Sequence, residues 1–142
     1  MSDPGPLQRF VEAQDHGRTY ESACDELRAA SKRSHWMWFV FPQLAGLGRS
    51  PTAQRYAIAS LPEAEAYLAH PVLGSRLTEC ARILTQLRGS SATDIFGSVD
   101  ALKLRSSMTL FARVRFADPV FQQVLDAYFG GEHDPATERL LA

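Results

Sequence analysis

The chain has few of the residues and motifs that mark specialised classes of protein. Its 142 residues include only two cysteines, Cys24 and Cys80, and these form no C-x-x-C pair, so neither a zinc-finger nor a thioredoxin-like motif is present. We expect both thiols to be buried and reduced. No H-E-x-x-H motif and no pair of histidines four residues apart occurs, so we expect no bound metal or cofactor.

The chain also lacks an excess of charge of either sign and any long apolar run. Its formal net charge is -1, with acidic and basic residues interspersed, so there is no positive field of the kind that holds duplex DNA. The apolar run from Trp36 to Phe41 is far too short to cross a bilayer, and Met1 to Pro6 lacks the regions of a signal peptide. We therefore expect a cytoplasmic protein that binds neither duplex nucleic acid nor membranes.

What the sequence does contain is typical of one globular domain. Hydrophobic residues make up 45% of the chain and charged residues 22%, and 142 residues are enough to bury one core. We expect residues 7–142 to form a single domain, preceded by a flexible N-terminal segment at residues 1–6.

Proline residues occur where helices are expected to begin. In four places a proline follows a residue that can cap a helix or form a turn, and proline at the first helical position sacrifices no intrahelical hydrogen bond. These pairs are Ser50-Pro51, His70-Pro71, Asp118-Pro119 and Asp134-Pro135.

Apolar residues at helical spacing support this interpretation. They recur every three or four positions from Pro71 to Gly89 and from Pro119 to Gly130, and glycine is a common helix stop. Other helices are expected near Leu7, from Thr19, from Pro62 to Ala69, from Asp100 and from Pro135.

The segment from Trp36 to Phe41 fits two interpretations, because its aromatic residues also favour strands. We favour a helix that continues from Thr19 through Trp38, since no partner strand is evident elsewhere. The predicted fold is all-α, a single compact domain of about seven or eight helices.

The segment from Ser34 to Gln43 is the most unusual stretch of the chain. Two tryptophans, two phenylalanines and a methionine follow His35, more than a helix needs to bury one face. An apolar wall with a few polar groups, here His35 and Gln43, suits a small-molecule pocket. The alternative is a dense core in which His35 is hydrogen-bonded and has no further role.

A glycine-containing loop follows this segment. Gly46 and Gly48 lead through Ser50 into an expected helix start, where backbone amides could meet an anion. The spacing matches neither the Walker motif nor a dinucleotide fingerprint, and a plain connecting loop is the alternative.

The expected helix from Asp100 carries further polar residues. Lys103 and Ser107 share a helical face, so an amine could activate a hydroxyl. The alternatives are an Asp100 cap, an ion pair between Asp100 and Lys103, and serine hydroxyls that bond backbone carbonyls.

Four segments together resemble a bacterial family, the domain of unknown function 1810. They are HWMWFVFPQ from His35, the GLG-S loop from Gly46, AHPVLGSRL from Ala69 and KLRSSMTLF from Lys103. The resemblance runs from about Leu7 to the C-terminus, and it implies an all-helical single domain with no established activity. Some members carry the label calpastatin, a disordered calpain inhibitor, which this sequence with its aromatic residues and regular helix starts does not resemble.

The motif positions of this family add to the candidate residues found above. Polar residues among them are hard to explain by packing, because a buried polar group costs about 1 to 3 kcal/mol unless it is paired. The candidate ligand-binding residues are His35, Trp36, Trp38, Gln43, Gly46, Gly48, Ser50, Tyr56, Lys103, Arg105, Ser106 and Ser107.

Three hypotheses of function follow from these residues. The leading one is that the His35–Gln43 segment, the Gly46–Ser50 loop and the Lys103–Ser107 helix line a cleft that binds a small polar or anionic ligand. The second is a non-enzymatic interaction module, in which exposed aromatic residues dock a protein partner or a second copy of the chain. The third is an enzyme that uses His35 as a general base or Lys103 with a serine nucleophile.

Overall fold

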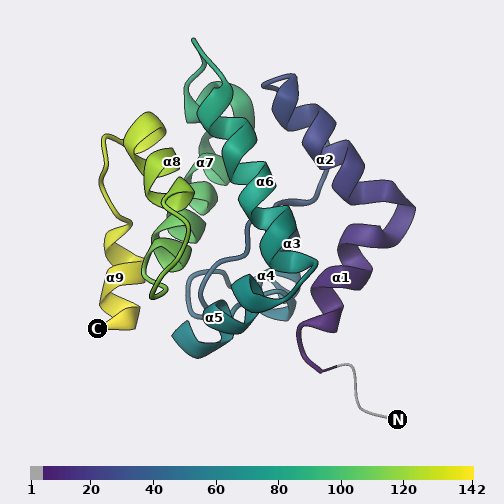
Figure 1. Cartoon of the computed structure of the whole chain (residues 1–142), viewed down its shortest axis with the longest axis vertical. Helices are drawn as coiled ribbons and strands as arrows, with labels where there is room; N and C mark the ends of the chain where they lie inside the picture. The colour runs from purple at the N-terminus through teal and green to yellow at the C-terminus, as the bar shows by residue number, and fades with distance from the viewer. Residues whose placement is uncertain (1–4) are drawn as a thin grey trace.

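The regular structure of residues 5–142, which the computed structural model describes, is helical (Figure 1). The elements are α1 (Gln8–Asp15), the short 3-10 helix η1 (His16–Arg18), α2 (Thr19–Arg28), α3 (Met37–Val40), α4 (Pro51–Arg55), α5 (Leu61–Ala69), α6 (Leu73–Gln86), α7 (Ala92–Ala112), α8 (Val120–Phe129) and α9 (Pro135–Leu141). One isolated parallel bridge joins Leu44 to Ile58. The all-α prediction is confirmed. Most of the N-terminal segment expected to be flexible, residues 1–4 of it, lies outside the described residues.

Two of the four proline pairs begin their helices as expected. The Ser50 hydroxyl accepts a hydrogen bond from the Ala53 amide, and the Asp134 carboxylate accepts one from the Thr137 amide. In both cases the following proline is the first residue of the helix.

At the other two pairs the helix begins later than the proline. α6 begins at Leu73, and His70 Nδ1 accepts hydrogen bonds from the Val72 and Leu73 amides at 3.1 and 3.2 Å. α8 begins at Val120, whose amide donates to Asp118 Oδ1 at 2.9 Å. His70 and Asp118 therefore accept hydrogen bonds from amides at these helix starts, but they lie three and two residues before the first helical residue.

The prediction of one helix from Thr19 through Trp38 is wrong, because α2 ends at Arg28. The Ser31 amide donates to the Glu26 carbonyl and the Ala30 amide to the Leu27 carbonyl, with Ala30 at a φ of 56°. This is a Schellman motif, which usually has glycine at the left-handed position. Because alanine stands at this position, nothing in the sequence indicated that the helix ends here.

The helix expected to start at Asp100 is also placed differently. α7 begins at Ala92, where Ser91 and Asp94 form a capping box, and it bends at Gly97, which has a φ of 81°. Asp100 therefore lies inside α7 and caps nothing. Its carboxylate instead meets Lys32 and Lys103.

α6 and α7 lie at the centre of the fold. In Figure 1 the α1–α2 pair covers one side and the α8–α9 pair the other. α6 packs against α2, α5 and α8, while α7 packs against α5, α8 and α9. None of the helices within residues 5–142 is long and apolar enough to span a membrane.

Candidate functional site

The first tryptophan of the aromatic segment belongs to the core. Trp36 is fully buried, and its indole N–H donates to Glu26 Oε1 at 3.0 Å. Its ring packs against Phe41 and against Phe96 of α7. Trp36 is therefore no exposed anchor for a partner protein.

The second tryptophan brings the aromatic segment to α7. Lys103 Nζ lies 4.9 Å from the centre of the half-buried Trp38 ring, and it lies 3.5 Å from Asp100 Oδ1. Asp100 Oδ2 also meets Lys32 Nζ at 2.9 Å, and the Lys32 side chain is only 8% exposed. Asp100 is thus shared by two lysines, and the group of Lys32, Asp100 and Lys103 keeps a net positive charge beside the Trp38 ring.

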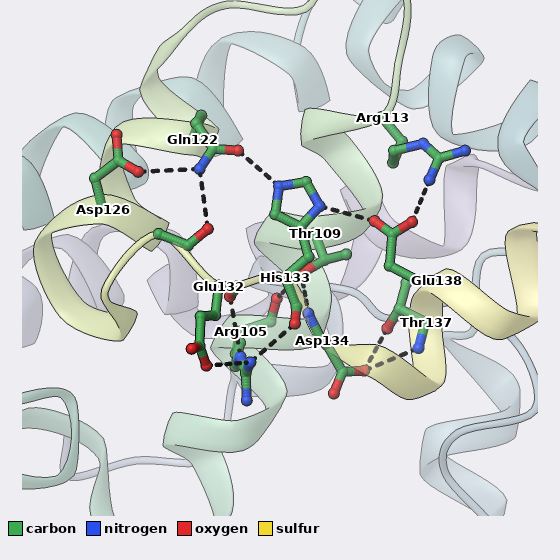
Figure 2. Close-up of polar contacts among 11 residues, drawn as sticks. Arg105, Thr109, Arg113, Gln122, Asp126, Glu132, His133, Asp134, Thr137 and Glu138 are labelled. Carbon is green, nitrogen blue, oxygen red and sulfur yellow. Dashed lines mark hydrogen bonds and ion pairs between the residues drawn. The ribbon is translucent and has the colours of Figure 1, made fainter.

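Arg105 and Ser106 hold the C-terminal helix. Arg105 donates to the carbonyls of Glu132 and His133 at 3.1 and 2.8 Å, and Ser106 Oγ lies 3.2 Å from Asp134 Oδ2. The Arg105 contacts, which Figure 2 shows, and the Ser106 contact attach the chain before α9 to the side of α7. The hydroxyl of Ser107 is buried and has no hydrogen-bond partner among the described residues.

A polar network around His133 extends this attachment, as Figure 2 shows. His133 Nδ1 lies 2.7 Å from Glu138 Oε1, and its Nε2 lies 2.7 Å from Gln122 Oε1. The same Glu138 carboxylate pairs with Arg113 of the α7 end. The network links α7, α8 and α9. Its Glu138 carboxylate is paired with Arg113 and lies beside His133.

The glycine loop is tightly packed. A Cβ on Gly48 would clash with the Ala53 side chain, and Gly46, at a φ of 101°, faces Leu140 of α9. The Gln43 carbonyl accepts a hydrogen bond from the Ile58 amide at 2.8 Å. Ser50 caps α4, a helix of only five residues. The loop residues therefore have structural roles: the two glycines allow close packing, and Ser50 starts α4.

A cavity of about 400 Å³ lies between α1, η1 and the end of α4. Two of the candidate residues, His35 and Tyr56, line it, and Phe39 of the aromatic segment lies beside them. The other lining residues are Arg9, Glu12, Ala13, His16, Thr19 and Arg55. The cavity therefore gathers two arginines, two histidines and one carboxylate, that of Glu12, which lies one turn after Arg9 in α1.

Arg9 is held in place at the base of this cavity. Its Nε donates to the Arg55 carbonyl at 2.7 Å, and its Nη2 donates to the Ala57 carbonyl at 2.8 Å. Its guanidinium stacks 4.3 Å from the Phe10 ring centre and meets Glu63 at 3.5 Å. Its Nη1 also donates to the Pro6 carbonyl, so each of the three guanidinium nitrogens has a partner and the side chain is fixed in place.

Aromatic rings form the other wall. The Tyr56 ring lies 5.3 Å from Phe39, edge to face, and 5.8 Å from Phe10. Arg55 lies over the Tyr56 ring at 5.6 Å and forms no ion pair within residues 5–142. The cavity thus combines an apolar wall with a cation that has no carboxylate partner in the described chain.

The sequence interpretation missed the contribution of α1. Arg9, Glu12 and Ala13 recur at helical spacing and so share one face of α1, which was a detectable signal. Nothing local indicated that this face meets Arg55, which is 46 residues away. Within the described chain, no group of three or more His, Cys, Asp or Glu residues could hold a metal.

Comparison with known proteins gives two matches. The family model described as "Protein of unknown function (DUF1810)" matches residues 4–141. The crystal structure of the conserved hypothetical protein Rv1873 from Mycobacterium tuberculosis shares 55% sequence identity, with a TM-score of 0.93 over 98% of each chain. No curated protein matches.

Proposed function

This chain belongs to the DUF1810 family, and from the cavity between α1 and α4 we propose that it binds a small anionic ligand there. The observation that supports the proposal most directly is the grouping of Arg9, Arg55, His16 and His35 around one cavity. Arginine and histidine are the side chains that proteins use to bind carboxylate and phosphate groups. A ligand with either group would suit the site.

The state of the two arginines supports an anion in particular. Arg9 is already oriented by carbonyl oxygens and by Glu63, so it would lose little side-chain entropy on binding but would share its charge with that carboxylate. Arg55 has no carboxylate partner in the described chain, so an incoming anion would not have to displace one. The Glu12 carboxylate, which also lines the cavity, would favour a ligand that carries a hydroxyl or amino group as well.

The size and the aromatic wall of the cavity favour a small organic molecule. Its volume of about 400 Å³ lies in the lower part of the range usual for ligand pockets. Phe39 and Tyr56 offer apolar contact to a carbon skeleton, and the Tyr56 hydroxyl has no partner within residues 5–142. We therefore expect a metabolite with a short carbon skeleton and an anionic group.

The test is a thermal-shift screen of the purified protein with inorganic phosphate, sugar phosphates and small carboxylic acids, followed by calorimetric titration of each hit. A ligand at about a hundred times its Kd stabilises the folded state by about 2.7 kcal/mol, a readable shift. Arg55→Ala and His35→Ala should each weaken binding about tenfold or more. The control is Arg139→Ala, which removes an exposed arginine of α9 outside the cavity.

Two results would contradict the proposal. One is a screen in which no anion shifts the melting temperature. The other is an anion that binds Arg55→Ala as tightly as the unchanged protein, because its site would then lie elsewhere.

A further inference from the structure

A second and larger cavity lies between α5, α6 and the loop that joins α7 to α8. Its volume is about 800 Å³, and none of the candidate residues from the sequence lines it. α6 contributes Ser75, Thr78 and Arg82, and α5 contributes Glu65. The α7–α8 loop contributes Arg115 to Asp118 and closes the other side.

Phe116 stands out in this loop. The Ala117 amide donates to the Val114 carbonyl at 3.2 Å and closes a four-residue turn with Phe116 at its third position. The φ of Phe116 is 64°, a left-handed conformation that glycine usually supplies at this turn position. A bulky residue in such a conformation is a genuine outlier, and outliers of this kind concentrate at functional sites.

The Phe116 side chain gains no burial that would offset this strain. It is 90% exposed, the most exposed of the large hydrophobic residues in the described chain. Arg115 lies over the ring, with its guanidinium carbon 4.8 Å from the ring centre. The loop thus presents an aromatic ring and a cation together at the edge of the cavity.

The loop is anchored at Asp118, two residues after Phe116. Asp118 Oδ2 meets Arg82 Nη2 of α6 at 2.7 Å, and Asp118 Oδ1 accepts from the Val120 amide at the start of α8. The Arg82 side chain is still 58% exposed, so part of its guanidinium faces solvent. A second arginine, paired with Asp118, therefore lies on the α6 wall of the same cavity.

We propose that this cavity is a second binding site, which takes a mononucleotide. The base would stack on Phe116, and the phosphate would bind Arg115 and Arg82. Base stacking on an exposed aromatic side chain is a common mode of nucleotide recognition, and arginine binds phosphate through paired N–H groups. Glu65 and Ser75 could accept or donate hydrogen bonds to ribose hydroxyls or base amino groups.

The cavity itself favours a small ligand over a partner protein. About 800 Å³ lies within the range of small-molecule sites, and the lining mixes charged, hydroxyl and apolar side chains. Leu68, Val114 and Phe121 also line the cavity, and of these Val114 and Phe121 are buried in the core. A ligand with a planar apolar part and a charged part fits such a lining better than a purely apolar helix would.

The experiment is calorimetric titration with AMP, GMP and UMP, compared with adenosine and with inorganic phosphate. We expect a mononucleotide to bind at least tenfold more tightly than adenosine or phosphate alone, because only the mononucleotide uses both the ring and the arginines. Phe116→Gly should lower the nucleotide affinity at least tenfold. Its melting temperature should stay unchanged or rise, because glycine adopts the left-handed conformation without strain.

Two further variants make the test specific. Phe116→Trp should keep nucleotide affinity within threefold, since tryptophan also stacks. Leu102→Ala removes another large exposed side chain, 65% exposed on α7 and outside the cavity, and should leave binding unchanged. Arg55→Ala should also leave nucleotide affinity unchanged, so that failure here and failure of the proposed anion site can be told apart.

Three outcomes would overturn the proposal. In the first, no mononucleotide binds the unchanged protein. In the second, Phe116→Gly binds the nucleotide as tightly as the unchanged protein does. In the third, the protein is a dimer in size-exclusion chromatography and Phe116→Gly makes it monomeric, which would assign the exposed ring to contact between two copies of the chain.

Discussion

At the scale of single residues, Glu26 organises the chain where it leaves α2. Its Oε1 accepts hydrogen bonds from the Arg33 and Ser34 amides at 2.7 and 2.9 Å, and from the Trp36 indole at 3.0 Å. The Ser34 hydroxyl donates to its Oε2. Partial burial acts to raise the pKa of Glu26, but the hydrogen bonds outweigh it and lower the pKa from 4.5 to about 2. One carboxylate thus positions the start of the aromatic segment.

Replacing Glu26 by Gln should destabilise the fold by about 1–3 kcal/mol at pH 7, because the charged acceptor of a buried indole is lost. The folded-state pKa is depressed, so the ionised carboxylate contributes its full stability above pH 4.5. That contribution is lost as the pH falls towards 2. The difference in the free energy of unfolding between the unchanged protein and Glu26→Gln should therefore become smaller as the pH is lowered. Urea unfolding at pH 7 and at pH 2.5 measures it, and an equal difference at both values would contradict the assignment.

Ser106 and Ser107 are neighbours with opposite expected effects on stability. Ser106→Ala removes a contact with Asp134 and should cost about 1 kcal/mol. Ser107→Ala removes a buried hydroxyl that has no partner among the described residues, so we expect no loss and a gain of up to about 1 kcal/mol. Urea unfolding of the two variants side by side is the measurement. Equal destabilisation of the two variants would contradict this assignment.

At the scale of elements, the pair α5 and α6 shows how closely two helices can approach. Gly74 lies in the first turn of α6, and a Cβ there would overlap the carbonyl oxygen of Leu68 in α5. The same two helices form one wall of the larger cavity. The close approach at Gly74 therefore helps to set the shape of the proposed nucleotide site.

Gly74→Ala should destabilise the protein by about 1–3 kcal/mol, because the added methyl group pushes α5 and α6 apart. Helix propensity alone predicts the opposite sign, since alanine is favoured over glycine by about 1 kcal/mol inside a helix. Thermal unfolding of the variant decides between the two effects. Ser75→Ala, at an exposed position next in the chain, is the matched control and should change the melting temperature little.

At the scale of the whole molecule, one continuous core connects all the long helices. α7 packs against α5, α8 and α9, and α6 links α2 to α8. The aromatic segment joins this core through the contact between Trp36 and Phe96. The buried apolar residues of the described chain therefore form one cluster. The two proposed sites lie on different groups of helices around the same core.

We therefore expect the protein to unfold in one cooperative step. The helical signal in far-ultraviolet circular dichroism and the fluorescence of Trp36 and Trp38 should follow the same urea transition, because the tryptophans report on the region where the aromatic segment meets α7. Two transitions at different urea concentrations would show that the N-terminal helices or α9 unfold independently.

The sequence by itself determined the features whose causes lie within a turn or two of the chain. The Ser50-Pro51 and Asp134-Pro135 starts follow from capping and from the fixed φ of proline. The stripes of α6 and α8, and the stop at Gly130 with a φ of 62°, follow from helical spacing and from the freedom of glycine. These signals were sufficient to predict the all-α fold.

Only the tertiary structure decided the end of α2 and the composition of the two cavities. Alanine at Ala30 adopts a left-handed conformation because Glu26 and the core hold the chain that follows, which no local rule predicts. Arg9 and Arg55 meet across 46 residues, and Phe116 faces a cavity whose other wall is α6. Local signals act through hydrogen bonds between near neighbours in the chain, whereas a cavity depends on how whole helices pack, and that packing was decided by the entire core.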